Sequence, residues 1–167
     1  MNKTRNTLPL ETRKVAVEYL NVTVAEMLDL FARIKQAHWN LRGMAFIGLH
    51  KLLDEFAAAT LAHIDSVAER ATALGGVVEG TLRDAVKQSG LKKKEEPNSV
   101  SGQTDWLVEL ADAHATTTGH IRKAIKKLTD EDDFATADLL TEVLGHLEKQ
   151  LWLLEAHLEK ALVANKK

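Results

Sequence analysis

Residues 46–74 read FIGLHKLLDEFAAATLAHIDSVAERATAL, and the spacing of their apolar side chains is typical of an amphipathic helix. Apolar residues recur at steps of three and four and fall on one side of a helical wheel. They are Leu49, Leu52, Leu53, Phe56, Ile64, Val67 and Leu74. Gly75-Gly76 follows directly and is typical of a helix end. We therefore predict a helix from about Phe46 to about Leu74.

Two further long helices are predicted from the same kind of periodicity. The first covers residues 10–41, where an apolar stripe runs up to the break at Gly43. The third covers residues 103–128, where leucine and isoleucine recur on one face together with His114. Both segments are long enough to pack along the full length of the helix at 46–74.

A fourth helix is predicted after a capping box formed by Thr129 and Asp132, and it carries a leucine stripe over residues 140–162. The connection between the second and third helices is long. It contains a short amphipathic segment at residues 81–88 and a polar loop at 92–102. No β-hairpin pattern competes with the helices. The sequence therefore predicts an all-α four-helix bundle with a short extra helix between the second and third helices.

The composition is that of one globular domain. The chain has 167 residues, so we expect a single domain over 1–167 with short tails at 1–9 and 163–167. Cysteine is absent, so a metal ion must be held by histidine and carboxylate. The polar N-terminus shows no signal peptide, and no apolar run reaches the ~20 residues that span a bilayer, which predicts a cytoplasmic protein without membrane contact. A net charge of −2 excludes a chain-wide basic surface for nucleic acid.

Four potential metal ligands share one face of the helix at 46–74. With His50 at zero on the helical wheel, Asp54, Asp65 and Glu69 fall at roughly 40°, 60° and 100°. The apolar stripe lies at roughly 200–320°, so we expect the ligand face to point away from the chain's own core. The residues placed between the ligands on this face are Ala57, Ala58, Leu61 and Ala62.

The distance between the ligand pairs requires a second copy of the chain. His50 and Asp54 are one helical turn apart, and so are Asp65 and Glu69. The two pairs are separated by about 22 Å along the helix, so they cannot meet on one ion within one chain. Antiparallel packing of a second copy across a two-fold axis would join unlike pairs and create two identical sites. The crossing is expected at residues 57–60, where small side chains permit close approach.

A fifth potential ligand, His38, ends the first helix and is expected to lie near His50. Histidines from one copy with carboxylates from the other suit Fe(II), with Zn(II) as a competitor. The alternative is that histidines and acids on helix faces make ordinary polar contacts. That interpretation is assigned to the remaining histidines, which are His63, His114, His120, His146 and His157. Because no Glu-x-x-His sequence occurs, a di-iron site inside the bundle is not expected.

The stretch KQAHWNLRG at residues 35–43 and the residues that follow resemble the Dps family of mini-ferritins. The resemblance continues through AERA at 68–71 and LGG at 74–76 to Leu151-Trp152, and it covers nearly the whole chain. It implies a ferritin-like bundle with Trp39 beside an iron-oxidising site. The family's ligands fall on His38, His50, Asp54, Asp65 and Glu69.

The resemblance also implies an activity and an assembly. Members of the family are ferroxidases that form hollow dodecamers built from two-fold dimers. They oxidise Fe(II), typically with hydrogen peroxide in preference to dioxygen, store the ferric mineral and protect DNA from oxidative damage. A second hypothesis is a DNA-binding, nucleoid-compacting structural protein whose iron chemistry is secondary. A third is a dimeric helical interaction module whose surface acids are incidental.

Two secondary roles are predicted for charged segments. The acidic run at 130–133 and the acid at position 138 are hypothesised to line a three-fold pore that attracts Fe(II). The candidate pore residues are Asp130, Asp133 and Asp138. The alternative for the run is stabilisation of a helix N-terminus. Basic residues at both ends could contact DNA when displayed many times, or could merely favour solubility. They are Lys3, Arg5, Lys166 and Lys167.

Overall fold

The computed structural model describes residues 1–91, 97 and 102–158. Within these residues the chain forms five helices and no strand. The helices are α1 (Leu10–Asn40), α2 (Phe46–Ala73), α3 (Leu82–Gln88), α4 (Gln103–Asp130) and α5 (Phe134–Ala156). The predicted all-α bundle with an extra short helix is confirmed. The predicted stripe up to Leu162 and the tail at 163–167 extend beyond the described residues.

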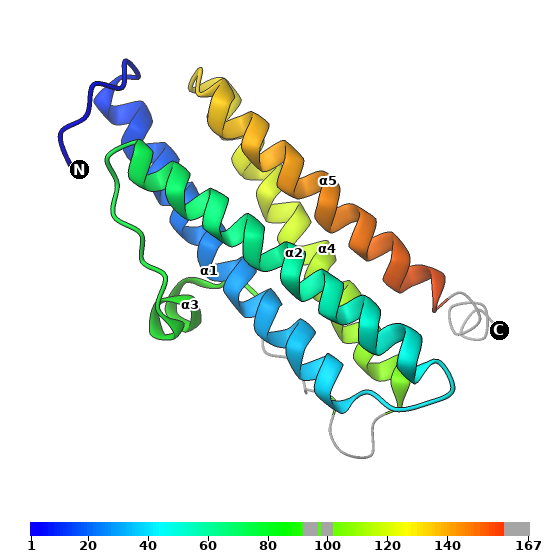
Figure 1. Ribbon diagram of the computed structural model, residues 1–167. Helices are drawn as coiled ribbons and strands as arrows, with labels where there is room; N and C mark the ends of the chain where they lie inside the picture. Colours follow the sequence, from blue (N-terminus) through cyan, green and yellow to red (C-terminus); the bar gives the residue numbers. More distant parts are fainter. Residues whose placement is uncertain (92–96, 98–101, 159–167) are drawn as a thin grey trace.

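The four long helices lie side by side as two antiparallel hairpins (Figure 1). α1 packs mainly on α2, and α4 packs mainly on α5. α1 also packs on α4, whereas α2 and α5 contact each other much less. The connection after α2 runs back along the bundle and places α3 beside α1 (Figure 1). None of the described helices is both long and apolar enough to span a lipid bilayer.

The predicted apolar stripe of α2 faces the core. One residue that was assigned to the ligand face is buried as well. Leu49, Leu53 and Val67 are fully buried, while Leu52 is half-buried. Ala57 was predicted to lie on the ligand face but is only 3% exposed and packs in the core. Its position on the wheel, roughly 340°, adjoins the buried stripe, and the close packing of α1 widens that stripe enough to cover it.

The capping box predicted for the fourth helix is wrong. α4 continues through Thr129, whose hydroxyl donates to the carbonyl of Ile125 at 2.9 Å. Asp133 caps α5 instead, because its Oδ1 accepts from the N–H of Thr136 at 3.1 Å. Asp132 has a φ of 60° and turns the chain between the helices, a conformation that short polar side chains tolerate better than most.

The glycine pair after α2 is required by close packing. Gly75 has a φ of +86°, and its carbonyl accepts from the N–H of Asn2 at 2.6 Å. A Cβ on Gly76 would lie 2.6 Å from both γ-carbons of Val17. The end of α2 therefore sits directly against α1 and holds the N-terminal segment in place.

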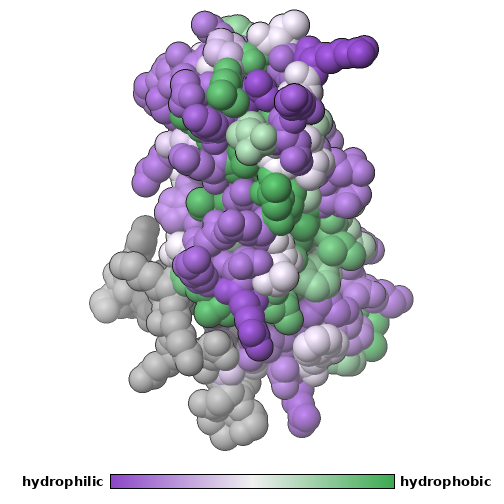
Figure 2. Space-filling view, turned by 90° about the vertical axis from the view of Figure 1, so that its left-hand side faces the viewer, coloured by the Kyte–Doolittle hydropathy of each residue, from purple (hydrophilic) through white to green (hydrophobic). Residues whose placement is uncertain are grey.

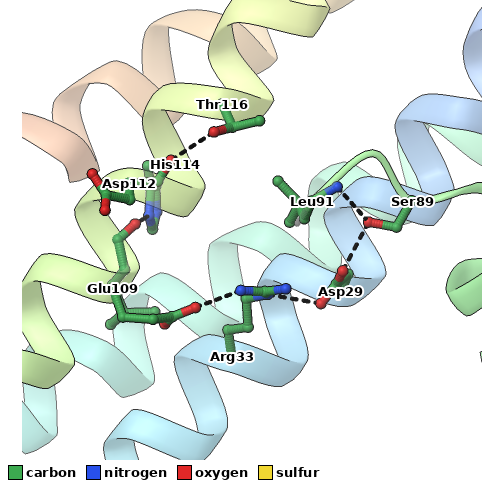
Figure 3. A network of polar contacts seen from close by, with 9 residues as sticks. Asp29, Arg33, Ser89, Leu91, Glu109, Asp112, His114 and Thr116 are labelled. Atoms are coloured by element: carbon green, nitrogen blue, oxygen red, sulfur yellow. Dashed lines mark hydrogen bonds and ion pairs between the residues drawn. The ribbon is translucent and has the colours of Figure 1, made fainter. Parts of the chain in front are cut away.

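A polar network ties the connection after α3 to the bundle (Figure 3). Arg33 of α1 donates to Asp29 at 2.9 Å and to Glu109 of α4 at 2.5 Å. The hydroxyl of Ser89 donates to the other oxygen of Asp29 at 2.8 Å and accepts from the N–H of Leu91 at 3.2 Å. This network holds residues 89–91 against α1.

Candidate metal centre

Two histidines meet where α1 ends and α2 begins. The rings of His38 and His50 are stacked with their centroids 3.7 Å apart. Nδ1 of His38 lies 2.8 Å from the carbonyl oxygen of His50, and Nδ1 of His50 lies 3.0 Å from the carbonyl oxygen of His38. A carbonyl oxygen only accepts, so each Nδ1 carries a hydrogen and donates it. In the neutral rings, the lone pair of each Nε2 is then free to bind a metal ion.

The short connection between α1 and α2 produces this pairing. α1 ends at Asn40, and the side chain of Leu41 is only 1% exposed, which anchors the turn in the core. Gly43 follows with a φ of +142°, and a Cβ there would lie 2.9 Å from Oε1 of Gln103. The chain reverses within a few residues, so the last turn of α1 faces the first turn of α2.

Asp54 lies one turn after His50, on the exposed surface of α2. Its Oδ1 is 4.0 Å from Nε2 of His38 and accepts a hydrogen bond from Nζ of Lys35 at 2.8 Å. The hydrogen bond and the positive charge of Lys35 hold the pKa of Asp54 below its ordinary value. An ionised carboxylate therefore lies near two imidazoles whose Nε2 atoms are free, at one end of the bundle.

Asp65 and Glu69 are exposed on the same side of α2 but lie far from the first group. Fifteen residues separate His50 from Asp65, or about 22 Å of helix. Within the part of the chain that the structure describes, no three histidine or acidic side chains are arranged to hold a metal ion. The structure thus stacks His38 on His50, places Asp54 4.0 Å from His38, and leaves Asp65 and Glu69 apart from these three residues.

The surface around Asp65 is an apolar groove of about 570 Å³ between α1, α2 and residues 78–80. Leu61 is 51% exposed there, and the small side chains of Ala58 and Ala62 leave the backbone of α2 accessible. Apolar surface also runs through the middle of the face drawn in Figure 2, between polar ends. A face of this kind, with acids and small apolar residues, is suited to contact with another protein surface.

Trp39, predicted beside the metal site, projects from the end of α1. It is 69% exposed, so it is not a core residue of this chain. Nζ of Lys35 lies 5.8 Å from the centre of its ring, within the range of a cation–π contact. Lys35 therefore touches both Asp54 and Trp39.

Lys35 is the neighbour that sequence reasoning missed. The available signal was its position, three residues before His38 on the same helix, which places both side chains on one face. The reciprocal carbonyl contacts of the two histidines had no signal in the sequence, because any residue supplies a carbonyl oxygen.

The acidic turn divides into buried and exposed carboxylates. Asp133 is 1% exposed and receives hydrogen bonds from Thr136 and, at 2.9 Å, from Arg70. Asp130 lies at the surface beside Lys126, and Asp138 is exposed. The helix-capping alternative describes Asp133, whereas the other two candidate pore residues face solvent.

The candidate DNA contacts are only partly described by the structure. Lys3 and Arg5 are exposed in the segment before α1. This segment is held at Asn2 by the hydrogen bond to Gly75. Lys166 and Lys167 lie outside the described residues.

Three other histidines make the ordinary polar contacts predicted for them. His114 is fully buried, with Nδ1 2.7 Å from the carbonyl of Leu110, and burial lowers its pKa. His120 pairs with the buried carboxylate of Glu26 at 2.6 Å. His157 contacts the carbonyl of Leu153 at 2.7 Å. None of these belongs to the group at the end of α1.

The order of the four long helices and the long connection that carries α3 are those of a ferritin-like protein. A profile of the ferritin-like domain matches residues 17–162. DpsC from Streptomyces coelicolor superposes with a TM-score of 0.88 at 33% identity, covering 94% of this chain and 91% of that chain. Mycobacterium smegmatis Dps also gives a TM-score of 0.88, at 29% identity, with 94% of each chain covered.

A relative with a closely similar sequence identifies the family within the ferritin-like class. The DNA protection during starvation protein of Agrobacterium fabrum is 38% identical over 159 residues, which are 95% of this chain and 97% of that protein. The chain belongs to the Dps family of ferritin-like proteins. The family suggested by residues 35–43 and the motifs after them is therefore confirmed.

Proposed function

We propose that the protein is a ferroxidase and iron store. It oxidises Fe(II) with hydrogen peroxide or dioxygen at sites shared between two copies. It holds the ferric product inside a hollow homo-oligomer of twelve copies built from two-fold dimers. The observation that carries this proposal is the reciprocal pairing of His38 and His50, which leaves both Nε2 lone pairs free beside the carboxylate of Asp54.

One chain supplies only half of the proposed site. His38, His50 and Asp54 offer two nitrogens and a carboxylate, and Asp65 and Glu69 of a second copy would add two further carboxylates. Antiparallel packing of the exposed faces of α2 would form two such sites around one two-fold axis. Nitrogen and carboxylate ligands with open positions suit Fe(II), and Zn(II) is the expected competitor.

The proposed reaction moves electrons from substrate iron to the oxidant. Two Fe(II) ions each lose one electron, and hydrogen peroxide takes up two electrons and two protons to give two water molecules. The carboxylates favour the ferric product because Fe(III) is the harder cation. The carbonyl contacts at Nδ1 fix both imidazoles in the tautomer and orientation that bind metal, so little reorganisation is needed.

Two side chains next to the proposed iron site, Lys35 and Trp39, influence it. Lys35 occupies Asp54 until a metal ion replaces it, which keeps the carboxylate ionised. Trp39 lies at the edge of the site, where a second copy would cover its exposed indole. Iron would enter past Asp130 and Asp138, whose exposed carboxylates attract cations.

Protection of DNA follows from the same chemistry. Consuming Fe(II) and peroxide together removes the two reactants that produce hydroxyl radicals, so a cytoplasmic protein could protect DNA without touching it. The alternative, direct compaction of DNA, has weaker support. The basic residues Lys3 and Arg5 lie on a segment held to the bundle at Asn2 rather than on a free tail.

The test is peroxide-dependent oxidation of Fe(II) by the purified full-length assembly, with its mass measured in parallel. The double variant Asp65→Asn/Glu69→Gln should lower the oxidation rate by more than about tenfold, because the contributed ligands lose their charge. The matched control is Glu18→Gln/Glu155→Gln, which removes two exposed carboxylates from α1 and α5. The control should oxidise iron at the unaltered rate.

Assembly and chemistry are separated by a mixing experiment. The variants His38→Gln/His50→Gln and Asp65→Asn/Glu69→Gln each lack a different half of the proposed site. Refolding them together should restore activity in the mixed dimers, since one site of each dimer is then intact. Mixed dimers with no gain in rate would contradict a site shared between copies.

A further inference from the structure

The seam between α2 and α5 holds a second pair of histidines. The rings of His63 on α2 and His146 on α5 meet edge to face, with centroids 4.6 Å apart and planes at 65°. Glu142 lies one turn before His146 on α5. His63 is half-buried at this seam, whereas Glu142 and His146 are exposed. The ring contact and the one-turn spacing on α5 therefore gather two imidazoles and a carboxylate at this seam.

The ring nitrogens of this pair are unusual in having no protein partner. No hydrogen bond or ion pair joins them to any residue that the structure describes. Every other histidine in the chain has its Nδ1 in contact with an oxygen. These histidines are His38, His50, His114, His120 and His157. In the seam pair, protein atoms thus leave both nitrogens of each ring available for a ligand.

The seam is separate from the ligand face described above. On the helical wheel of α2, His63 falls at roughly 220°, whereas His50, Asp54, Asp65 and Glu69 lie between 0° and roughly 100°. Arg70 lies two turns after His63 on the same side of α2. Its guanidinium group is already bonded to Asp133 and Thr136. The seam pair therefore lies apart from the proposed ferroxidase site.

We propose that His63 and His146, with Glu142 as a third ligand, bind a divalent transition-metal ion between α2 and α5. Two neutral imidazoles and one carboxylate form a ligand set suited to Zn(II), Co(II) or Fe(II). The spacing of four residues places Glu142 and His146 on one face of α5. This inference does not depend on the ferroxidase proposal.

Binding requires side-chain rotation. The rings meet edge to face, and no three potential ligands among the described residues already surround a common point. His146 and Glu142 are exposed, so both have room to turn toward the ion. A bound ion would join the α1/α2 hairpin to the α4/α5 hairpin along the α2/α5 seam, which is less closely packed than the α1/α4 seam. It should therefore stabilise the fold as well as bind.

The test is Zn(II) titration of the metal-free full-length protein in the His38→Gln/His50→Gln background, which removes both imidazoles of the other site. Calorimetry should show one Zn(II) ion bound per chain, and zinc should raise Tm. Both the binding and the rise in Tm should be lost in His146→Gln. Glu142→Gln should weaken the binding. The matched control is His157→Gln, which removes another exposed histidine of α5 and should retain both signals.

A second variant keeps the test decisive if one substitution disturbs folding. His63→Gln removes the ligand on the other helix and should abolish the same zinc equivalent, with helical content checked by circular dichroism. Unchanged zinc stoichiometry and an unchanged Tm shift in both His63→Gln and His146→Gln would overturn the proposal. Loss of both signals in His157→Gln would also overturn it.

Discussion

Nζ of Lys35 lies 2.8 Å from Oδ1 of Asp54, and the same oxygen lies 4.0 Å from Nε2 of His38. An ammonium group thus occupies one side of the carboxylate that the proposed iron site would use. A metal ion bound by His38 and Asp54 would compete with Lys35 for this carboxylate oxygen. The positive charges of the ion and of Lys35 would also repel each other. The ion pair is exposed, so the competition is expected to be modest.

Replacing Lys35 with methionine should strengthen metal binding. The substitution keeps the apolar part of the side chain and removes the charge, so affinity for Zn(II) at this site should rise, by about fivefold at most for an exposed pair. The pKa of Asp54 should return upward, because its lowering comes first from the hydrogen bond and charge of Lys35. Calorimetry and carboxyl titration by NMR measure the two effects. Lys14→Met removes another ion-paired lysine of α1 and should change neither quantity.

Substitution of the exposed acids near the α4–α5 turn should change iron uptake rather than stability. Asp130→Asn/Asp138→Asn should slow the uptake of Fe(II) into the assembly without lowering Tm, because both side chains are exposed. Stopped-flow measurement of the uptake phase tests the entry route, and unaltered uptake would count against it.

Asp133→Asn, or more severely Asp133→Ala, should act on stability instead. Loss of the helix cap costs about 1 kcal/mol, and loss of the buried acceptor for Arg70 adds about 1.5–3 kcal/mol. Denaturant unfolding should show this loss in Asp133→Ala but not in Asp130→Ala. Equal unfolding midpoints for the two variants would contradict the assignment of Asp133 as the cap.

Gly76→Ala should destabilise the fold although alanine is a small residue. Its Cβ would lie 2.6 Å from two carbons of Val17 and 2.8 Å from the carbonyl of Ala71, so α1 and α2 would have to separate. A loss of about 1–3 kcal/mol is expected. Gly145→Ala is the control, since its Cβ meets nothing within 4 Å and should stabilise α5 by about 0.5–1 kcal/mol. Thermal melts of both variants give the comparison, and a Gly76→Ala variant as stable as the parent would refute it.

His114 should make the fold sensitive to acid. Burial lowers its folded-state pKa below the ordinary 6.5, so the unfolded chain takes up a proton first as pH falls. Stability should therefore decrease as pH drops below about 6.5 and level off once the pH is below the folded-state pKa. His114→Leu should flatten this dependence while lowering stability near neutral pH, because Gln150 loses its partner at 3.0 Å. His157→Leu should leave the profile intact, and a steep profile in His114→Leu would exclude His114 as its source.

Several features of the fold could be read from residue spacing. α1, α2, α3 and α4 follow the predicted ranges to within two residues, since an apolar stripe with period 3.6 is a property of the chain itself. α5 begins at Phe134, after the predicted capping box, and its predicted stripe extends beyond the described residues. The exposure of Asp54, Asp65 and Glu69 follows from the same wheel. Predictions based on one or two residues failed more often. Ala57 lies at the edge of a stripe whose width depends on the neighbouring helix, and Thr129 was displaced as a cap by Asp133.

The amino-acid sequence by itself determined the helices, their buried faces and the separation of the two ligand pairs along α2, because periodicity and rise per residue are local. Only the tertiary structure decided which nitrogens of His38 and His50 stay free and that Lys35 occupies Asp54. It also brought His63 and His146 into contact. Those facts depend on which atoms of distant segments meet when the helices pack, and helical periodicity carries no information about those meetings.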